Sequence, residues 1–243
     1  MATKGKFIAL ICIVGILSAC HFSQPTLRTL NTVDGARVNS YVQSPLQVGT
    51  DTLDLRWNQN GTPGRLAIAE IITYSGSATA VNAPEGWRLI RDDISPTTRQ
   101  TLYWRVIQSC DPNIQRWTFS RRVTAQGLML VIDGFDAKKP IDSDSGNVGN
   151  GFTLTANSMR TNRDGDLILA FFSTDFRGSS PGHDVPHNMS VIVDQDKDGA
   201  THEYWLLGAY QESRGWTGDI ICKAAQVFSW AAAQVAIRRH AAG

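Results

Sequence analysis

The sequence predicts an all-β protein with a jelly-roll-like antiparallel β-sandwich, and three observations lead to this fold class. Apolar and polar residues alternate in segments such as 53–57 and 102–106, which is the spacing of a strand with one buried face. Turn-forming clusters of Gly, Pro and Asn separate these segments, as at 60–64 and 149–151. The segments are also short and numerous, which is typical of a sandwich or barrel.

The expected strands follow one another along the whole body of the chain. In order they fall at 53–57, 66–72, 102–106, 117–119, 128–132, 167–172, 191–193, 204–207 and 227–237. By composition, residues 224–239 suit a helix as well, although their Val, Phe and Trp content fits a last core strand equally.

A faint internal repeat divides this body into two pseudo-equivalent halves. Gly64–Ala69 aligns with Gly165–Ala170 at an offset of 101 residues (165 − 64), and at the same offset Tyr103-Trp104 falls on Tyr204-Trp205. The repeat predicts that each half of the chain contributes equivalent strands to one sandwich. Chance similarity among apolar strands is the alternative.

The first nineteen residues have the pattern of a secretion signal. Lys4 and Lys6 precede an apolar run at 7–17, which is too short for a spanning helix of roughly 20 residues. The run ends in Leu17-Ser18-Ala19-Cys20, which resembles the lipobox of bacterial lipoproteins. The resemblance implies cleavage after Ala19 and a diacylglycerol on the Cys20 thiol. An ordinary signal with a chance cysteine is the alternative.

Acylation of Cys20 predicts a chain that is held by membrane lipid and folded in water, because two or more acyl chains anchor firmly. His21, where Asp would favour the inner membrane, favours the outer membrane in a Gram-negative cell. The expected organisation is a signal peptide at 1–19, a lipidated cysteine and flexible tether at 20–48, and a β-sandwich at 49–243.

Charge and cysteine content narrow the function classes further. The chain has 23 basic and 22 acidic residues; without Lys4 and Lys6 the balance is 21 against 22, so nothing favours a nucleic-acid partner. Cleavage would leave Cys110 and Cys222 besides Cys20. In an oxidising compartment an even remainder predicts one disulfide between them, with two separate thiols as the alternative.

Five segments of the body have a recurring form: Gly165–Ala170, Ala83–Trp87, Tyr103–Val106, Trp117–Ser120 and Phe135–Asp142. They resemble the segments GDLLLA, PPGW, YYRVA, YTWTFS and GVDTxNPID of a widespread class of bacterial secreted and phage-tail-associated β-sandwich domains. The similarity runs roughly from Gly64 to Ile237, and the first repeat departs from it with Arg65 in place of Asp. It implies a jelly-roll-like fold and a surface-binding or structural role, and it supplies no catalytic residues.

Tyr103 and Arg105 are candidate ligand-binding residues. Leu102, Trp104 and Val106 share one face of their strand, so Tyr103 and Arg105 point to the other face. An outward aromatic ring can stack on a sugar, and Arg can hydrogen-bond its hydroxyls. A glycan is therefore a candidate partner, although a single exposed Tyr is also ordinary.

Asp194, Asp196 and Asp198, followed by Gly199, form the first half of a calcium-binding loop. Carboxylates at alternate positions supply the hard oxygen ligands that Ca²⁺ prefers. Loop position twelve is Trp205 instead of Glu, so the segment is not an EF-hand. A plain acidic turn is the alternative.

One motif points to catalysis, but its surroundings argue against it. Gly178–Gly182 matches the G-x-S-x-G of serine hydrolases, which functions as an elbow between a strand and a helix. The prolines and glycines around His183 and His187 exclude that helix. We therefore expect no enzyme, but a binding or structural lipoprotein of the envelope. A carbohydrate-binding or adhesive module, with a glycan or an envelope protein as partner, is the alternative, and a hydrolase is a weaker one.

Overall fold

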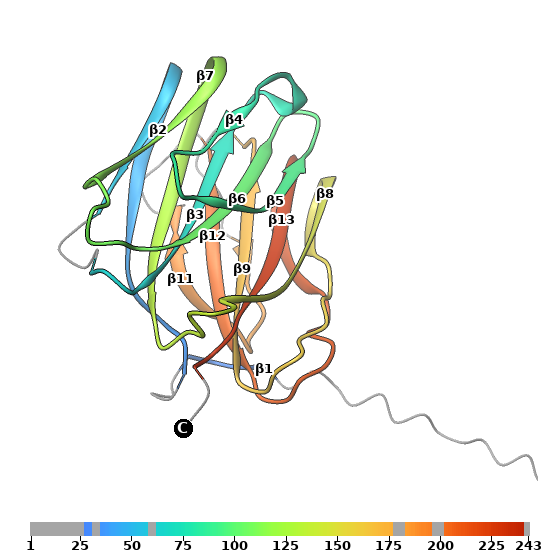
Figure 1. Cartoon of the computed structure of the whole chain (residues 1–243). Coiled ribbons are helices and arrows are strands. Elements are labelled where there is room, and N and C mark those ends of the chain that lie inside the picture. The colour runs from blue at the N-terminus through green and yellow to red at the C-terminus, as the bar shows by residue number, and fades with distance from the viewer. Residues whose placement is uncertain (1–26, 31–34, 58–61, 177–182, 196–201, 241–243) are drawn as a thin grey trace, which may run out of the picture.

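The protein folds into two antiparallel β-sheets (Figure 1). The structure is a computed structural model, and it describes residues 27–30, 35–57, 62–176, 183–195 and 202–240. The two sheets confirm the predicted all-β sandwich. The elements are β1 (Leu27–Arg28), β2 (Arg37–Arg56), β3 (Leu66–Thr73), the short 3-10 turn η1 (Gly76–Ala78), β4 (Val81–Asn82), β5 (Arg88–Ile94), β6 (Arg99–Val106), β7 (Ile114–Asp133), β8 (Ile141–Ala156), β9 (Asp166–Thr174), β10 (His183–Asp184), β11 (Ser190–Asp194), β12 (Tyr204–Gln211) and β13 (Ile220–Ile237).

Apart from the two-residue β1, each sheet is built from one half of the chain. The first-half sheet has the order β2-β7-β3-β6-β5, with β4 paired to β7. The second-half sheet contains β8-β13-β9-β12-β11, with β10 paired to β13, and β1 adds to β12. The two orders correspond strand for strand, so the structure supports the two equivalent halves that the repeat predicted.

The register corrects one part of the repeat alignment. Ala69 lies opposite Tyr103, whereas its equivalent Ala170 lies opposite Leu207. Tyr103 is therefore equivalent to Leu207 and not to Tyr204. Tyr204 belongs to the core between the sheets, and Tyr103 faces the opposite side of its own sheet. The shared Tyr-Trp pair is a coincidence, because a three-residue shift turns each side chain to the other face.

Apolar side chains form three layers instead of one. The central layer lies between the sheets and includes Leu66, Ile68 and Phe171. A second layer covers the outer face of the first-half sheet, and a third covers the outer face of the second-half sheet. Strands β3 and β9 are consequently buried along their whole length, which explains why both read as nearly continuous apolar runs.

The outer layer of the first-half sheet depends on the bending of the β2–β7 ribbon. The pairing of these 20-residue strands shifts register between Ser44 and Thr52, and such bulges bend strands. Beyond the bend, Leu53 and Trp117 pack in the same cluster as Ala69 of β3. The ribbon therefore covers a face that would otherwise be in solvent.

The equivalent polar positions at the start of β3 and β9 carry opposite charges. In the first half, Arg65 Nε lies 2.7 Å from Asp133 Oδ1, and Asn39 Nδ2 donates to Asp133 Oδ2 at 2.9 Å. In the second half, the positions of Arg65 and Asp133 are taken by Asp166 and Arg238. Arg65, which stands where the second repeat has Asp166, thus has an acidic partner in the position that the second repeat gives to Arg238.

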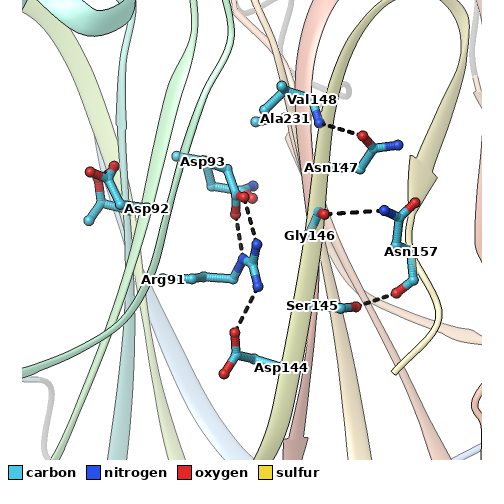
Figure 2. Close-up of polar contacts among 12 residues, drawn as sticks. Arg91, Asp92, Asp93, Asp144, Ser145, Gly146, Asn147, Val148, Asn157 and Ala231 are labelled. Atoms are coloured by element: carbon cyan, nitrogen blue, oxygen red, sulfur yellow. Dashed lines mark hydrogen bonds and ion pairs between the residues drawn. The ribbon is translucent and has the colours of Figure 1, made fainter. Parts of the chain in front are cut away.

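Arg91 links the free edges of the two sheets, as Figure 2 shows. From β5 it donates to Asp93 through Nε and Nη2 at 2.5 and 2.7 Å, and through Nη1 to Asp144 of β8 at 2.7 Å. Gly146 makes room for it, because a Cβ there would lie 2.2 Å from Arg91 Nη2. Asn157 Nδ2 reaches the Gly146 carbonyl at 3.4 Å, so part of this edge strand is protected against further pairing.

The predicted boundary between tether and sandwich is wrong for residues 37–48. These residues form the first part of β2, and Leu27–Arg28 already pair with β12. The cause is the environment of β2, an edge strand that is largely exposed or half-buried there, so its composition is as polar as that of a linker. Residues 1–26, including Cys20, lie outside the described residues. At the other end of the chain, β13 shows that residues 220–237 are strand and not helix.

Candidate functional site

Two adjoining pockets lie at the end of the first-half sheet where β6 stops. They have volumes of about 420 and 410 Å³ and share Gly86, Arg105 and Gln108. The first also includes Pro84, Glu85, Cys110, Asp111, Pro112 and Gln115, and the second includes Arg88, Trp104, Val106, Ala137 and Lys138. We call them the paired pockets.

Arg105 separates the paired pockets and is held from several sides. Its side chain forms a salt bridge with Asp111 and donates to the Glu85 carbonyl at 3.1 Å. The guanidinium carbon lies 5.9 Å from the centre of the Trp87 ring. The residue is 8% exposed, so its ion pair is shielded from water and is stronger than a surface pair.

The segment before β5 is shaped to receive this guanidinium. Gly86 has φ +84°, and a Cβ there would lie 3.0 Å from Arg105 Nη2, so both backbone and space favour glycine. Trp87 Nε1 donates to Gln115 Oε1 at 2.8 Å, and Gln115 Nε2 donates to the Pro112 carbonyl at 2.6 Å. The walls of the first pocket are therefore fixed by buried hydrogen bonds.

The second pocket is cationic. The Arg88 guanidinium lies 5.0 Å from the centre of the Trp104 ring, a cation–π distance. Lys138 follows a tight turn in which its backbone N–H donates to Asp136 Oδ1 at 2.9 Å, and this bond lowers the pKa of Asp136. Within the described residues, neither Arg88 nor Lys138 forms a salt bridge. Both charges are thus available to a ligand.

Three of the five segments singled out in the sequence analysis meet at the paired pockets. Ala83–Trp87 supplies the wall of the first pocket, Tyr103–Val106 supplies Arg105 and Trp104, and Phe135–Asp142 supplies Lys138. Sequence spacing did not predict this convergence, because the segments are separated by up to fifty residues and meet only through the β5–β6 pairing and the connection between the sheets.

The prediction for Tyr103 is wrong, and that for Arg105 needs revision. Tyr103 is on the face opposite Leu102, as alternation required, but it is only 6% exposed. Its hydroxyl donates to the Val81 carbonyl at 3.2 Å and its ring packs against Trp117; burial raises its pKa to about 12. The second apolar layer covers that face, so Tyr103 cannot stack on a sugar. Arg105 is also buried, but it lines the paired pockets.

The predicted disulfide is absent, because Cys110 and Cys222 are both free. Cys110 is exposed beside the first pocket, on the side of the first-half sheet. Cys222 is buried in the outer layer of the second-half sheet, where Trp205 Nε1 contacts its Sγ at 3.5 Å, and burial raises its pKa to about 12. The central core lies between the two outer layers, so the thiols lie on opposite sides of the sandwich.

The calcium prediction concerns a segment that is described only in part. Asp194 ends β11 opposite Trp205, whereas Asp196 and Asp198 lie outside the described residues. Among the residues that are described, no group of three acidic, His or Cys side chains could hold a metal. The segment 178–182 with the G-x-S-x-G match lies outside the described residues as well.

Two buried carboxyl groups escaped the sequence analysis. Glu70 in β3 is fully buried and accepts from Gln100 Nε2 at 2.7 Å, and burial raises its pKa to about 8. Asp166 in β9 is also fully buried, and burial together with the neighbouring Asp142 raises its pKa to about 7. Glu70 could have been noticed, because it occupies an inward position in the apolar run of β3.

The fold and the paired pockets define the chain as a β-sandwich with a polar, partly cationic recess at one end of the first-half sheet. No family model, curated protein or solved structure matches it.

Proposed function

We propose that the chain is a membrane-anchored bacterial lipoprotein whose β-sandwich is a non-catalytic binding module for an acidic polysaccharide of the cell surface. The observation that carries the binding proposal is the second pocket, where Arg88 and Lys138 border the Trp104 ring without salt-bridge partners in the described chain. Guanidinium and ammonium groups donate charge-assisted hydrogen bonds to carboxylate or phosphate oxygens. The buried Arg105 network gives the pocket a rigid wall.

The anchoring proposal depends on the signal and lipobox residues, with Cys20 as the acylated residue. Within the described residues no helix is long and apolar enough to cross a membrane. An outer-membrane location follows from His21 if the cell is Gram-negative.

Polygalacturonate tests the binding site, with neutral dextran as the comparison polymer. The double variant Arg88→Ala, Lys138→Ala should bind polygalacturonate at least about tenfold more weakly, since a hydrogen bond to a charged group contributes roughly 1.5–3 kcal/mol. Isothermal titration calorimetry measures the affinity, and the ligand should dissociate at high salt. Arg122→Ala is the matched control, because Arg122 is an exposed arginine in the β2–β7 bend, where its Nε donates to the Gly49 carbonyl. Equal affinity of the double variant and the wild-type protein would exclude the pocket.

Substitution of Cys20 by Ser tests the anchor. The variant should accumulate as an unacylated precursor or be released from the membrane, because no thiol remains to accept the diacylglycerol. Palmitate labelling and cell fractionation measure this, and Cys12→Ser within the signal is the control. The lipoprotein proposal fails if Cys20→Ser is cleaved after Ala19 and stays in the membrane fraction like the wild type.

A further inference from the structure

The chain enters the sandwich at a defined end. Leu27 and Arg28 of β1 pair with Gln211 and Tyr210 at the end of β12. The connections 157–165 and 212–219 lie at this same end, beside β1 in the lower part of Figure 1. The segments 134–140 and 238–240 also lie there, since Phe135 bridges Arg239 and Arg238 N donates to the Pro140 carbonyl. We call these four segments the base.

Trp216 projects from the base and is 64% exposed. The backbone that carries it is ordered by paired connections: Thr161 N donates to the Gly215 carbonyl at 2.8 Å, and Thr217 N donates to the Met159 carbonyl at 2.9 Å. Arg160 forms a β-bridge with Trp216 itself. The indole is thus held outward by a built scaffold.

Exposed cations outnumber acids on the base. Besides Lys138, which lines the second pocket, the exposed basic residues are Lys139, Arg160, Arg163, Arg214 and Arg239, and none of these five forms a salt bridge within the described chain. The carboxylates of the four acidic residues of the base all have hydrogen-bond or salt-bridge partners within the protein. Asp136, Asp164 and Asp219 accept the backbone N–H groups of Lys138, Arg214 and Ser158. Glu212 pairs with Arg28. The cations therefore remain available to an anionic surface.

The proposed anchor places this end close to the membrane. Seven Cα–Cα steps separate Cys20 from Leu27, so the two cannot be more than about 25 Å apart. If Cys20 carries lipid, the base is therefore the end of the sandwich that lies nearest to the bilayer.

We propose that the base docks on an anionic phospholipid surface, with Trp216 in the interfacial region and Arg160, Arg163 and Arg214 at the headgroup phosphates. Tryptophan has an apolar body and a polar N–H that suit this region, and basic side chains are attracted to anionic leaflets. The orientation rests on the acylation of Cys20 proposed above, whereas the affinity of the base for lipid does not.

Tryptophan quenching by brominated lipids tests the proposal. The acylated mature chain, which begins at Cys20, is reconstituted into brominated phosphatidylcholine vesicles, with or without phosphatidylglycerol. We expect quenching in the anionic vesicles that Trp216→Phe largely removes and that Arg160→Glu with Arg214→Glu reduces. Arg122→Glu, on the distant bend of β7, is the matched charge control and should leave the quenching unchanged. Equal quenching in wild type and Trp216→Phe, or no dependence on phosphatidylglycerol, overturns the docking.

A second measurement separates this proposal from the anchor. Cosedimentation of the unacylated mature chain, residues 20–243 with Cys20→Ser, with the same vesicles reports on the base without acyl chains and without the apolar signal run. The Arg160→Glu, Arg214→Glu pair should lower its partition into anionic vesicles about tenfold. If Cys20 is not acylated in cells but this partition difference is found, the anchor is wrong and the base proposal stands. If Cys20 is acylated but the difference is absent, the base proposal is wrong.

Discussion

Replacement of Trp117 by Ala should destabilise the protein by about 3–5 kcal/mol, the usual cost of removing a large aromatic side chain from a core. Trp117 is fully buried on β7 and contacts the rings of Trp87 and Tyr103 at centroid distances of 5.1 and 6.4 Å. It packs in the outer layer of the first-half sheet, so its loss opens the cover over β3 and β6.

Urea unfolding followed by circular dichroism measures this effect. Trp216→Ala is the matched control, since a 64% exposed tryptophan should change the unfolding free energy by no more than about 0.5 kcal/mol. If Trp117→Ala does not fold, Trp117→Phe should still fold with a lowered midpoint. Equal midpoints for Trp117→Phe and wild type would show that the outer layer does not contribute to stability.

The second large effect is a gain of stability on acidification from pH 8 to pH 6. Glu70 has a pKa of about 8 in the folded protein against 4.5 ordinarily, and Asp166 has about 7 against 3.8. At pH values between the ordinary pKa of each group and its raised pKa in the folded protein, the folded state binds more protons than the unfolded state. Stability therefore falls as pH rises through this window.

Glu70 alone should account for about 2–3 kcal/mol over these two pH units, at 1.36 kcal/mol per unit. The energetic reason is the burial of a carboxylate with one hydrogen-bond donor, Gln100, while Oε2 has no partner among the described residues. Glu70→Gln cannot ionise, so it should be more stable than wild type at pH 8 and should flatten the pH dependence.

Thermal unfolding at a series of pH values checks this prediction. Asp54→Asn is the control, because Asp54 is exposed and paired with Arg116, whose hydrogen bond lowers its pKa well below the window. Its slope between pH 6 and 8 should equal that of wild type. A Glu70→Gln variant with the wild-type slope would show that Glu70 is already ionised at pH 6.

Local pattern was sufficient for the buried strands of the sandwich, but not for the largely exposed β5, β8 and the first part of β2, which the sequence analysis did not predict. Alternation at 102–106 placed Leu102 and Tyr103 on opposite faces, and the structure agrees. The repeat at Gly64 and Gly165 indicated two halves, which now correspond strand for strand. The alternation of side chains along a strand and the formation of a turn are set by the backbone conformation of a few neighbouring residues. Both can therefore be predicted without knowledge of the fold.

The exposure of each face, by contrast, was decided only in three dimensions. Tyr103 was expected in solvent because one apolar face normally suffices for a sheet, but the bent β2–β7 ribbon covers the second face. The polar composition of residues 37–48 suggested a tether, although it belongs to an edge strand.

Which residues far apart in the chain come together was likewise decided only by the tertiary structure. The count of cysteines suggested a disulfide. In the structure, however, Cys110 lies on the side of the first-half sheet and Cys222 in the outer layer of the second-half sheet, on opposite sides of the sandwich. The paired pockets arise where Gly86, Arg105 and Lys138 meet across β5, β6 and the connection between the sheets. The sequence by itself determined the buried strands and the two halves, and it predicts a lipid anchor at Cys20. Only the tertiary structure decided which faces are buried and which distant residues share a site, because both depend on contacts between segments far apart in the chain.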